Sequence, residues 1–320
     1  MVIMRGRIDK DMKENLIYQQ VKTWIYRNAR PLDLARWQYH FEQGKKEAVI
    51  DALSAYQNKD GGFGYALEAD AWNPNSAPIQ VFQAIELLNE IGFEEKGHPL
   101  IQGILRYLDS GQDYKEGFWL TMVESNNDYP HAPWWSTSGQ SSCHDRFNPS
   151  AGLAGFGLYY SERGSSLYEK CASIAKKAAE YILTSDKLDM HVQRCFIAMT
   201  DFCKKADIID LYDIDRVEGK LKVLVNNTIT RDTSVWADSY ICKPSFFFHS
   251  RTSSFYQENK DIADYEVEFI SKNRNREGVW DVTWGWGAYP EQWAISELWW
   301  KVDIAIKNML FFENIGCEVL

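Results

Sequence analysis

The sequence has no excess of basic residues, no apolar run of membrane length and no signal-peptide core at its start. Its formal net charge is −10, which disfavours nucleic acid and anionic membranes as partners. No apolar stretch approaches the roughly 20 residues that a membrane-spanning helix needs. Residues 1–9 lack the apolar segment of a leader peptide. We therefore expect a cytoplasmic protein without a transmembrane segment.

Cysteine pairs at metal-binding spacing are also missing. The 6 cysteines contain no Cys-x-x-Cys motif, so neither a disulfide framework nor a zinc site is indicated. We expect reduced thiols and no bound metal from these residues, which are Cys143, Cys171, Cys195, Cys203, Cys242 and Cys317.

Aromatic residues, by contrast, are abundant. The chain contains 13 Trp, 17 Tyr and 16 Phe within an otherwise ordinary hydrophobic content of 45%. A core can absorb only part of this number of rings. Some of them should therefore line a cavity or groove.

A short motif recurs along the chain. Residues 112–119 read as an amide, four polar residues, Gly, any residue and Trp, and residues 273–280 repeat this order. Residues 57–63 form a close variant that ends in Phe, and a degenerate copy keeps only Trp236. Each copy follows a helical segment and precedes, after a loop of variable length, a helical segment that begins with Pro. Such self-similarity predicts a protein built from repeats.

Helical periodicity around these joints predicts six helix pairs and hardly any strand. In the third pair an irregular insertion, residues 114–148, separates the two helices, and a long loop of this kind is usually functional. In the fifth pair we expect the second helix to run from Pro244 to about Gln257. The expected pairs cover residues 11–43, 45–92, 98–162, 166–204, 213–257 and 265–308.

The two members of a pair differ in character. First helices, such as residues 170–181, carry Lys and Glu on one face, whereas residues 149–160 are small and apolar nearly all round, as in a buried helix. An inner ring of six helices wrapped by an outer ring satisfies both patterns. The sequence thus predicts an all-α (α/α)6 toroid in a single domain, residues 1–320. An open α-solenoid of stacked pairs is the alternative.

The Gln-x4-Gly-x-Trp joint of residues 112–119 resembles the repeat motif of squalene and oxidosqualene cyclases and of the protein prenyltransferase β-subunit. The resemblance covers most of residues 45–308 and implies the α/α toroid and an isoprenoid substrate. The motif residues themselves have structural roles: the amide ties down the turn, Gly permits the reversal, and Trp fills the gap between helices.

The functional motifs of these families are not present. The sequence has no Asp-x-Asp-Asp acid and no aspartate-rich diphosphate motif. Asp281-Val-Thr283 matches only part of the oxidosqualene cyclase acid, and Asp201-Phe-Cys203 has the letters of the prenyltransferase zinc motif at the wrong end of a helix. No cofactor is required by the sequence, although a diphosphate substrate would bring Mg²⁺. The oligomeric state is not indicated.

The loops that enter the second helices carry the candidate site. Carboxylates among aromatic rings can supply a general acid, and ring faces can stabilise a carbocation. The acid candidates are Glu68, Asp70, Asp238 and Asp281, and the expected substrate contacts are Trp72, His131, Trp134, Trp135, His144, Asp145, Trp284, Trp286 and Tyr289. In a toroid these loops would line the mouth of a central cavity.

Three functions remain open. The leading hypothesis is a terpenoid cyclase-like or prenyltransferase-like enzyme that acts on an isoprenoid or other apolar substrate. Paired carboxylates beside Trp rings also suit a carbohydrate-active (α/α)6 enzyme. A non-catalytic binding protein is the third hypothesis. Asp70 and Asp145, which precede predicted helices, can alternatively serve as helix caps.

Overall fold

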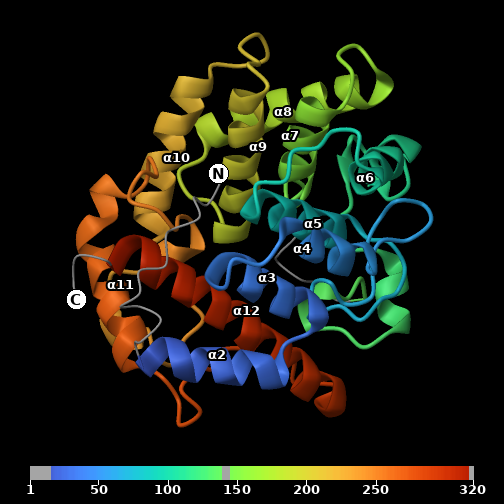
Figure 1. Cartoon of the computed structure of the whole chain (residues 1–320). Helices are drawn as coiled ribbons and strands as arrows, with labels where there is room; N and C mark the ends of the chain where they lie inside the picture. Colours follow the sequence, from blue (N-terminus) through green and yellow to red (C-terminus); the bar gives the residue numbers. More distant parts are fainter. Residues whose placement is uncertain (1–15, 139–144, 317–320) are drawn as a thin grey trace. The chain divides into compact units, whose positions relative to one another are not determined.

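The computed structural model describes residues 16–138 and 145–316, which are mostly helical (Figure 1). The all-α class predicted from the sequence is confirmed, and no helix in the described ranges is long and apolar enough to cross a membrane. The helices are α2 (Leu16–Asn28), α3 (Pro31–Phe41), α4 (Lys46–Ser54), α5 (Pro78–Glu90), α6 (Pro99–Ser110), α7 (Ser150–Tyr160), α8 (Ser166–Thr184), α9 (Met190–Lys205), α10 (Ile214–Thr228), α11 (Lys260–Lys272) and α12 (Pro290–Gly316).

The chain forms two compact units. Unit 1 contains residues 54–228, and unit 2 contains residues 2–53 and 229–320, of which 16–53 and 229–316 are described. Unit 2 is therefore built from both ends of the chain. The single domain expected from the sequence stays a prediction.

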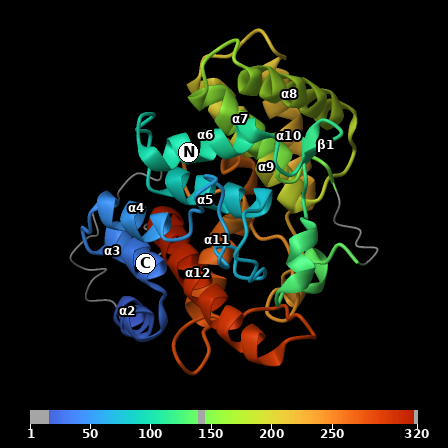
Figure 2. The same cartoon turned by 90° about the vertical axis from the view of Figure 1, so that its right-hand side faces the viewer.

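Unit 1 is organised around α7, which packs against both α8 and α9 (Figure 2). Helix α10 contacts the same two helices, while α5 and α6 contact α7. As predicted, α7 is buried along nearly its whole length. A Cβ atom on Gly152 would lie 2.1 Å from the ring of Phe82, and one on Gly155 would lie 2.6 Å from Met199 Cα. Close approach of α5 and α9 thus requires glycine at these positions.

The predicted insertion, residues 114–148, contains only short elements among its described residues. The strands β1 (Tyr114–Lys115) and β2 (Phe118–Trp119) form a hairpin whose turn residues, Glu116 and Gly117, have φ values of 54° and 87°. Two positive φ values are typical of the tight hairpin turn. Two 3₁₀ turns, η1 (Glu124–Asp128) and η2 (Pro133–Trp135), follow.

The glycine of each joint has the left-handed backbone that the motif predicts. The φ values are 96° at Gly61, 87° at Gly117 and 85° at Gly278. A side chain at such a φ is strained, so the reversal depends on glycine.

The aromatic residue of each joint is buried, which confirms its predicted packing role. Phe63, Trp119, Trp236 and Trp280 are at most 5% exposed. The indole N–H groups of Trp236 and Trp280 donate to backbone carbonyl groups at 3.0 Å, at Thr230 and Ile270 respectively. These rings fill their gaps in a fixed orientation.

The amide of the joint holds the turn in the first copy only. Gln57 Nε2 donates to the carbonyl oxygens of Gly61 and Leu100, both at 3.0 Å, and so ties the turn to α6. In the second copy Gln112 is exposed, and Asp113 takes part instead by accepting a bond of 2.8 Å from Tyr107 Oη.

In the third copy the turn is held by Asn275, and the expected role of Asn273 is wrong. Asn275 Oδ1 accepts from the backbone N–H groups of Glu277 at 2.9 Å and Val279 at 3.2 Å. The Asn273 side chain donates back to Phe269 O at the end of α11. The copies therefore align on their glycines and not on their amides.

The second helix predicted for the fifth pair is also wrong. Residues 244–257 contain only the 3₁₀ turns η4 (Pro244–Phe246) and the start of η5 (Gln257–Asn259), apart from bends and turns. Hydroxyl groups in this stretch bond to nearby backbone: Ser250 Oγ accepts from Thr252 N at 3.1 Å, and Ser253 Oγ accepts from Phe255 N at 3.3 Å. Such local bonds compete with helix formation.

Most other helix boundaries agree with the prediction to within a few residues. Helix α11 begins at Lys260 and not near Tyr265, and α12 continues to Gly316, beyond the expected end at 308. The first predicted helix is described from Leu16 onward. Its residues 11–15 lie outside the described ranges.

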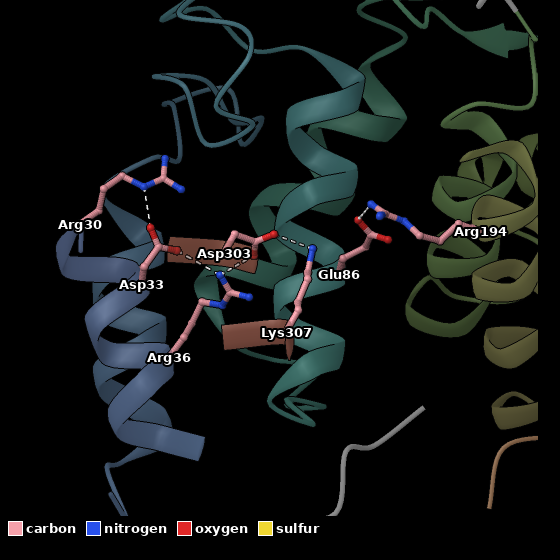
Figure 3. Close-up of polar contacts among 7 residues, drawn as sticks. All are labelled: Arg30, Asp33, Arg36, Glu86, Arg194, Asp303 and Lys307. Carbon is pink, nitrogen blue, oxygen red and sulfur yellow. Dashed lines mark hydrogen bonds and ion pairs between the residues drawn. The ribbon is translucent and has the colours of Figure 1, made fainter. Parts of the chain in front are cut away.

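Unit 2 is organised around α12, which packs against α2, α3, α11 and η4. A buried ion cluster joins α3 to α12 (Figure 3). Arg36, 2% exposed, donates through Nη1 to Asp33 Oδ1 at 3.0 Å and to Asp303 Oδ1 at 2.9 Å. Arg30 forms an ion pair with Asp33, and Lys307 forms one with Asp303, both 2.7 Å long.

Unit 1 has a smaller ion pair between helices. Arg194 of α9 pairs with Glu86 of α5 through Nη2 and Oε2, also drawn in Figure 3. Both side chains are partly exposed, at 29% and 22%. This pair should therefore contribute less to stability than the cluster around Arg36.

Replacement of Gly61 by alanine should destabilise unit 1 strongly. The alanine Cβ would lie 2.0 Å from Gly103 O, so the variant suffers a clash with the backbone in addition to the strain of a left-handed φ. We expect a loss of more than about 3 kcal/mol in urea unfolding. Gly111→Ala is the matched control: φ is 77° but a Cβ would meet nothing within 4 Å. A loss of only about 1–2 kcal/mol is expected there. Equal losses would show that the clash is relieved.

Replacement of Arg36 by methionine should leave Asp33 and Asp303 buried without the cation between them. Asp33 keeps Arg30 and Asp303 keeps Lys307, but the charged hydrogen bonds through which Arg36 links α3 to α12 are lost, so we expect a loss of about 2–3 kcal/mol. Glu268→Gln is the control, since it removes the exposed pair with Lys272, which is 2.8 Å long. Exposed pairs contribute at most about 1 kcal/mol. Similar midpoints of denaturant unfolding for the two variants would contradict the importance of the cluster.

Candidate functional site

The first group of candidate residues lies in the loop that leads into α5, within unit 1. Its backbone is unusual, because Tyr65 and Ala66 both have left-handed φ values, 58° and 57°. Two consecutive non-glycine residues in this region cost on the order of 1–3 kcal/mol each, and such strain concentrates at functional sites. Tyr65 N donates to Asn73 O at 2.9 Å, which closes the loop behind them.

A buried amide from α5 fixes the carboxylate segment of this loop. Gln80 is 0% exposed, accepts from Glu68 N through Oε1 at 2.7 Å and donates from Nε2 to Ala71 O at 3.0 Å. Glu68 Oε2 in turn accepts from Asp70 N at 3.1 Å. Both carboxyl side chains are buried, Glu68 at 8% and Asp70 at 3% exposure. Glu68 thus positions the backbone that carries Asp70.

The insertion supplies the next part of the group. Ala71 pairs with His131 in an antiparallel bridge, Ala132 N donates to Asp70 O at 2.8 Å, and Trp72 N donates to Pro130 O at 3.0 Å. His131 is 8% exposed, and its Nδ1 lies 2.6 Å from Tyr129 O. That carbonyl can only accept, so Nδ1 is the donor of this bond.

The tryptophan pair of the insertion is tied to the same loop. Trp134 and Trp135 lie in η2, half-buried, and Asn126 Nδ2 donates to Trp135 O at 3.1 Å. Asn73 Nδ2 then donates to Asn126 Oδ1 at 2.9 Å. Trp72 is also half-buried. The structure therefore brings two carboxyl groups, an imidazole and three indole rings onto two adjoining segments of unit 1.

Asp145 has a different setting. Its Oδ1 accepts from Phe147 N at 2.9 Å, and its Oδ2 accepts from Tyr181 Oη at 3.0 Å. These bonds hold the turn before α7, in line with the alternative structural role given to this residue. His144 lies outside the described residues.

The remaining acid candidates lie in unit 2, and both are exposed. Asp238 follows the buried Trp236 in a turn. Asp281 Oδ1 accepts from Asn275 Nδ2 at 3.0 Å and lies 3.1 Å from Lys301 Nζ. The Asn275 hydrogen bond and the Lys301 charge hold the pKa of Asp281 below its ordinary value. A carboxylate stabilised in this way is a poor proton donor.

The aromatic candidates of unit 2 pack mainly on one another. The Trp284 ring lies 5.5 Å from that of Trp300, and the Trp286 ring lies 5.6 Å from that of Trp293. Trp286 is 2% exposed, whereas Tyr289 is 40% exposed. Trp286 therefore has a core role, while Trp284 and Tyr289 can still meet a ligand.

Sequence reasoning missed the amides that organise the unit 1 site. Gln80 stands among apolar residues of a predicted helix, and a polar residue on a buried helix face is the signal that could have marked it. Asn73 and Asn126 carry no comparable signal, because asparagine in a loop is common.

A second missed cluster lies in unit 2. Glu266 of α11 is 1% exposed and accepts from Ser245 twice, from N at 2.8 Å and from Oγ at 2.5 Å. Burial raises its pKa to about 7, against the opposing effects of the Ser245 bonds and the Lys243 charge. Burial also lowers the pKa of Lys243.

No three or more His, Cys, Asp or Glu side chains come together as a metal site anywhere in residues 16–138 or 145–316. The described thiols of Cys171, Cys195, Cys203 and Cys242 are buried and form no disulfide bond with one another. The Mg²⁺ expected for a diphosphate substrate stays a prediction.

Comparison of the chain with protein-family models, with curated proteins and with solved structures finds no match. The resemblance to the terpenoid cyclases and prenyltransferases therefore depends on the joint motif alone.

Glu266 should make the stability of unit 2 depend on pH. Its folded pKa of about 7 lies above the ordinary value of 4.5, so its favourable contribution is complete below pH 4.5 and is lost as the pH rises through 7. Between these limits wild type should lose about 3 kcal/mol relative to Glu266→Gln in denaturant unfolding. Glu268→Gln, an exposed position on the same helix, should show no such trend. A pH-independent difference between wild type and Glu266→Gln would contradict the assignment.

Proposed function

We propose that the chain is an enzyme that protonates an isoprenoid or similar apolar substrate at the unit 1 site. The observation that carries the proposal is the burial of Glu68 and Asp70 on a strained loop held by Gln80, and of His131 on the segment bridged to it, each less than a tenth exposed. Polar side chains on a surface bond to water, whereas these are buried and depend on hydrogen bonds to the backbone, which is the arrangement expected of a preorganised site.

The roles follow from the bonds. Asp70 is the proposed acid, because the backbone on both sides of it is fixed by Glu68, Gln80 and Ala132. His131, on the bridged segment, is the proposed partner for proton transfer. Enzymes keep a carboxyl group protonated by enclosing it away from water. This arrangement favours Asp70 over Asp238 and Asp281, which are exposed.

The aromatic rings supply the second requirement of the proposed reaction, which is stabilisation of the carbocation formed by protonation. Trp72, Trp134 and Trp135 are half-buried, so each has a face that a ligand can reach. An indole face attracts a carbocation and also packs well on hydrocarbon. The (α/α)6 toroid predicted from the joints belongs to the same proposal, and its support is the all-α content and the buried joint residues.

A carbohydrate substrate is the second candidate. The same loops carry the amides Asn73 and Asn126, and Trp rings with buried carboxylates also suit a sugar. The two candidates differ in what should bind, so a ligand panel separates them. A third outcome, no binding of either class, would favour the non-catalytic protein.

The test combines native mass spectrometry and thermal shift with farnesyl and geranylgeranyl diphosphate, squalene and a set of oligosaccharides. A ligand that binds the folded state raises its melting temperature. We expect a shift with an isoprenoid that is lost in Trp134→Ala. A shift with oligosaccharides alone would replace the isoprenoid proposal with the carbohydrate one.

The acid itself is tested by turnover of the ligand found in that panel. Asp70→Asn keeps the side-chain shape, so it should bind the ligand but convert it at least about 100-fold more slowly. Asp238→Asn, an exposed carboxylate, is the matched control and should keep full turnover. Loss of turnover in Asp238→Asn alone would assign the acid to unit 2.

A further inference from the structure

Lys243 lies in unit 2 on a segment whose backbone is fixed on both sides. The preceding carbonyl, Cys242 O, accepts from Thr230 N at 2.8 Å. The following residues form η4, whose Ser245 is bound twice by the buried Glu266. The side chain of Lys243 therefore starts from a well-defined position.

Two aromatic rings lie beside the side-chain nitrogen of Lys243. Nζ lies 4.6 Å from the ring centroid of Phe269 and 5.7 Å from that of Trp236. Trp236 is 0% exposed and is held by its bond to Thr230 O. The Trp236 and Phe269 centroids are 5.5 Å apart at an interplanar angle of 74°. The two rings form an apolar corner beside the amine.

Lys243 Nζ makes no hydrogen bond and no ion pair with any described residue. Glu266 acts on it only through its charge, because the bonds of that carboxylate go to Ser245. Nζ is also not among the fully enclosed polar atoms that lack a partner, and the side chain is only half-buried. The amine is thus reachable from solvent and is not occupied by a protein acceptor.

Two effects act in opposite directions on its protonation. Ring faces and the Glu266 charge favour the ammonium form, while burial favours the neutral amine and lowers the pKa of Lys243. A lysine amine desolvated beside apolar side chains is the usual form of a nucleophilic lysine.

We propose that Lys243 is a covalent binding site for aldehydes that carry an apolar group. The Nζ lone pair adds to the carbonyl carbon, and the C–N bond forms as the carbonyl π bond breaks. The carbinolamine then loses its oxygen, which leaves as water with the two hydrogens of the neutral amine. The product is an imine, and no oxidant or reductant is needed. The ring of Phe269, which is partly exposed, would pack on the apolar group, and the fully buried Trp236 holds that ring in place. This site is independent of the one proposed in unit 1.

The test traps the imine by reduction. The full-length protein is incubated at pH 7 with benzaldehyde and sodium cyanoborohydride, and peptide mass spectrometry follows the modification of each lysine. We expect Lys243 to react at least 10-fold faster than Lys260 and Lys272. These two are suitable references because they lie in the same unit and are exposed. Their ammonium groups bond to Asp264 at 2.7 Å and Glu268 at 2.8 Å. Equal rates at the three lysines would overturn the proposal.

The role of the rings is tested by a second aldehyde and a second variant. Formaldehyde has no apolar group, so the advantage of Lys243 should be smaller with it than with benzaldehyde. Phe269→Leu keeps the amine and removes one ring, and circular dichroism shows whether it is folded. We expect the benzaldehyde advantage to fall several-fold in folded Phe269→Leu. An advantage that is the same for both aldehydes would overturn the apolar specificity.

Discussion

The tight joint is the constraint on which both units depend. Each reversal needs one residue with a left-handed backbone, Gly61, Gly117 or Gly278, and a large ring two residues later. The glycine sets the direction in which the chain leaves the turn, and the buried ring fixes the turn against the neighbouring helix. The loops that carry the candidate site follow these joints, so the position of Asp70 ultimately derives from the turn at Gly61.

The sequence was a reliable guide where the structure depends on residues that have few substitutes. A positive φ next to a close backbone neighbour admits only glycine, and a wide gap between helices needs a large ring, so both leave a visible pattern. The amide of the joint has no such restriction. The turn is bonded by Gln57 in one copy and by Asn275 in another, and these two residues stand at different sequence positions relative to the glycine. Several side chains can bond the same backbone groups, and a fixed spacing therefore failed to identify them.

The same reasoning explains which site residues were predictable. Glu68, Asp70 and His131 were predicted as site residues because they stand close to Trp residues in the sequence, and ionisable residues beside Trp are uncommon in a core. That the structure brings them onto adjoining segments depends on Gln80 and Asn126, which act through single hydrogen bonds. In residues 244–257 the sequence instead predicted a helix that the structure does not contain. Proline favours a helix start, but the hydroxyl groups of Ser250 and Ser253 offer the backbone other partners. Glu266 was missed because a charged residue on a predicted amphipathic helix is normally solvated, and Lys243 was missed because it precedes the predicted helix at Pro244.

The composition of unit 2 from both ends of the chain has a consequence for biosynthesis. Helices α2 and α3 are made before unit 1, yet α3 packs against α12, and Arg36 of α3 binds Asp303 of α12, which lies 267 residues later. At synthesis rates of about 5–20 residues per second, α3 waits roughly 13–53 s for these 267 residues, which include the whole of unit 1. Arg36 waits as long for Asp303. Unit 1 can therefore complete its fold before the two separate segments of unit 2 come together.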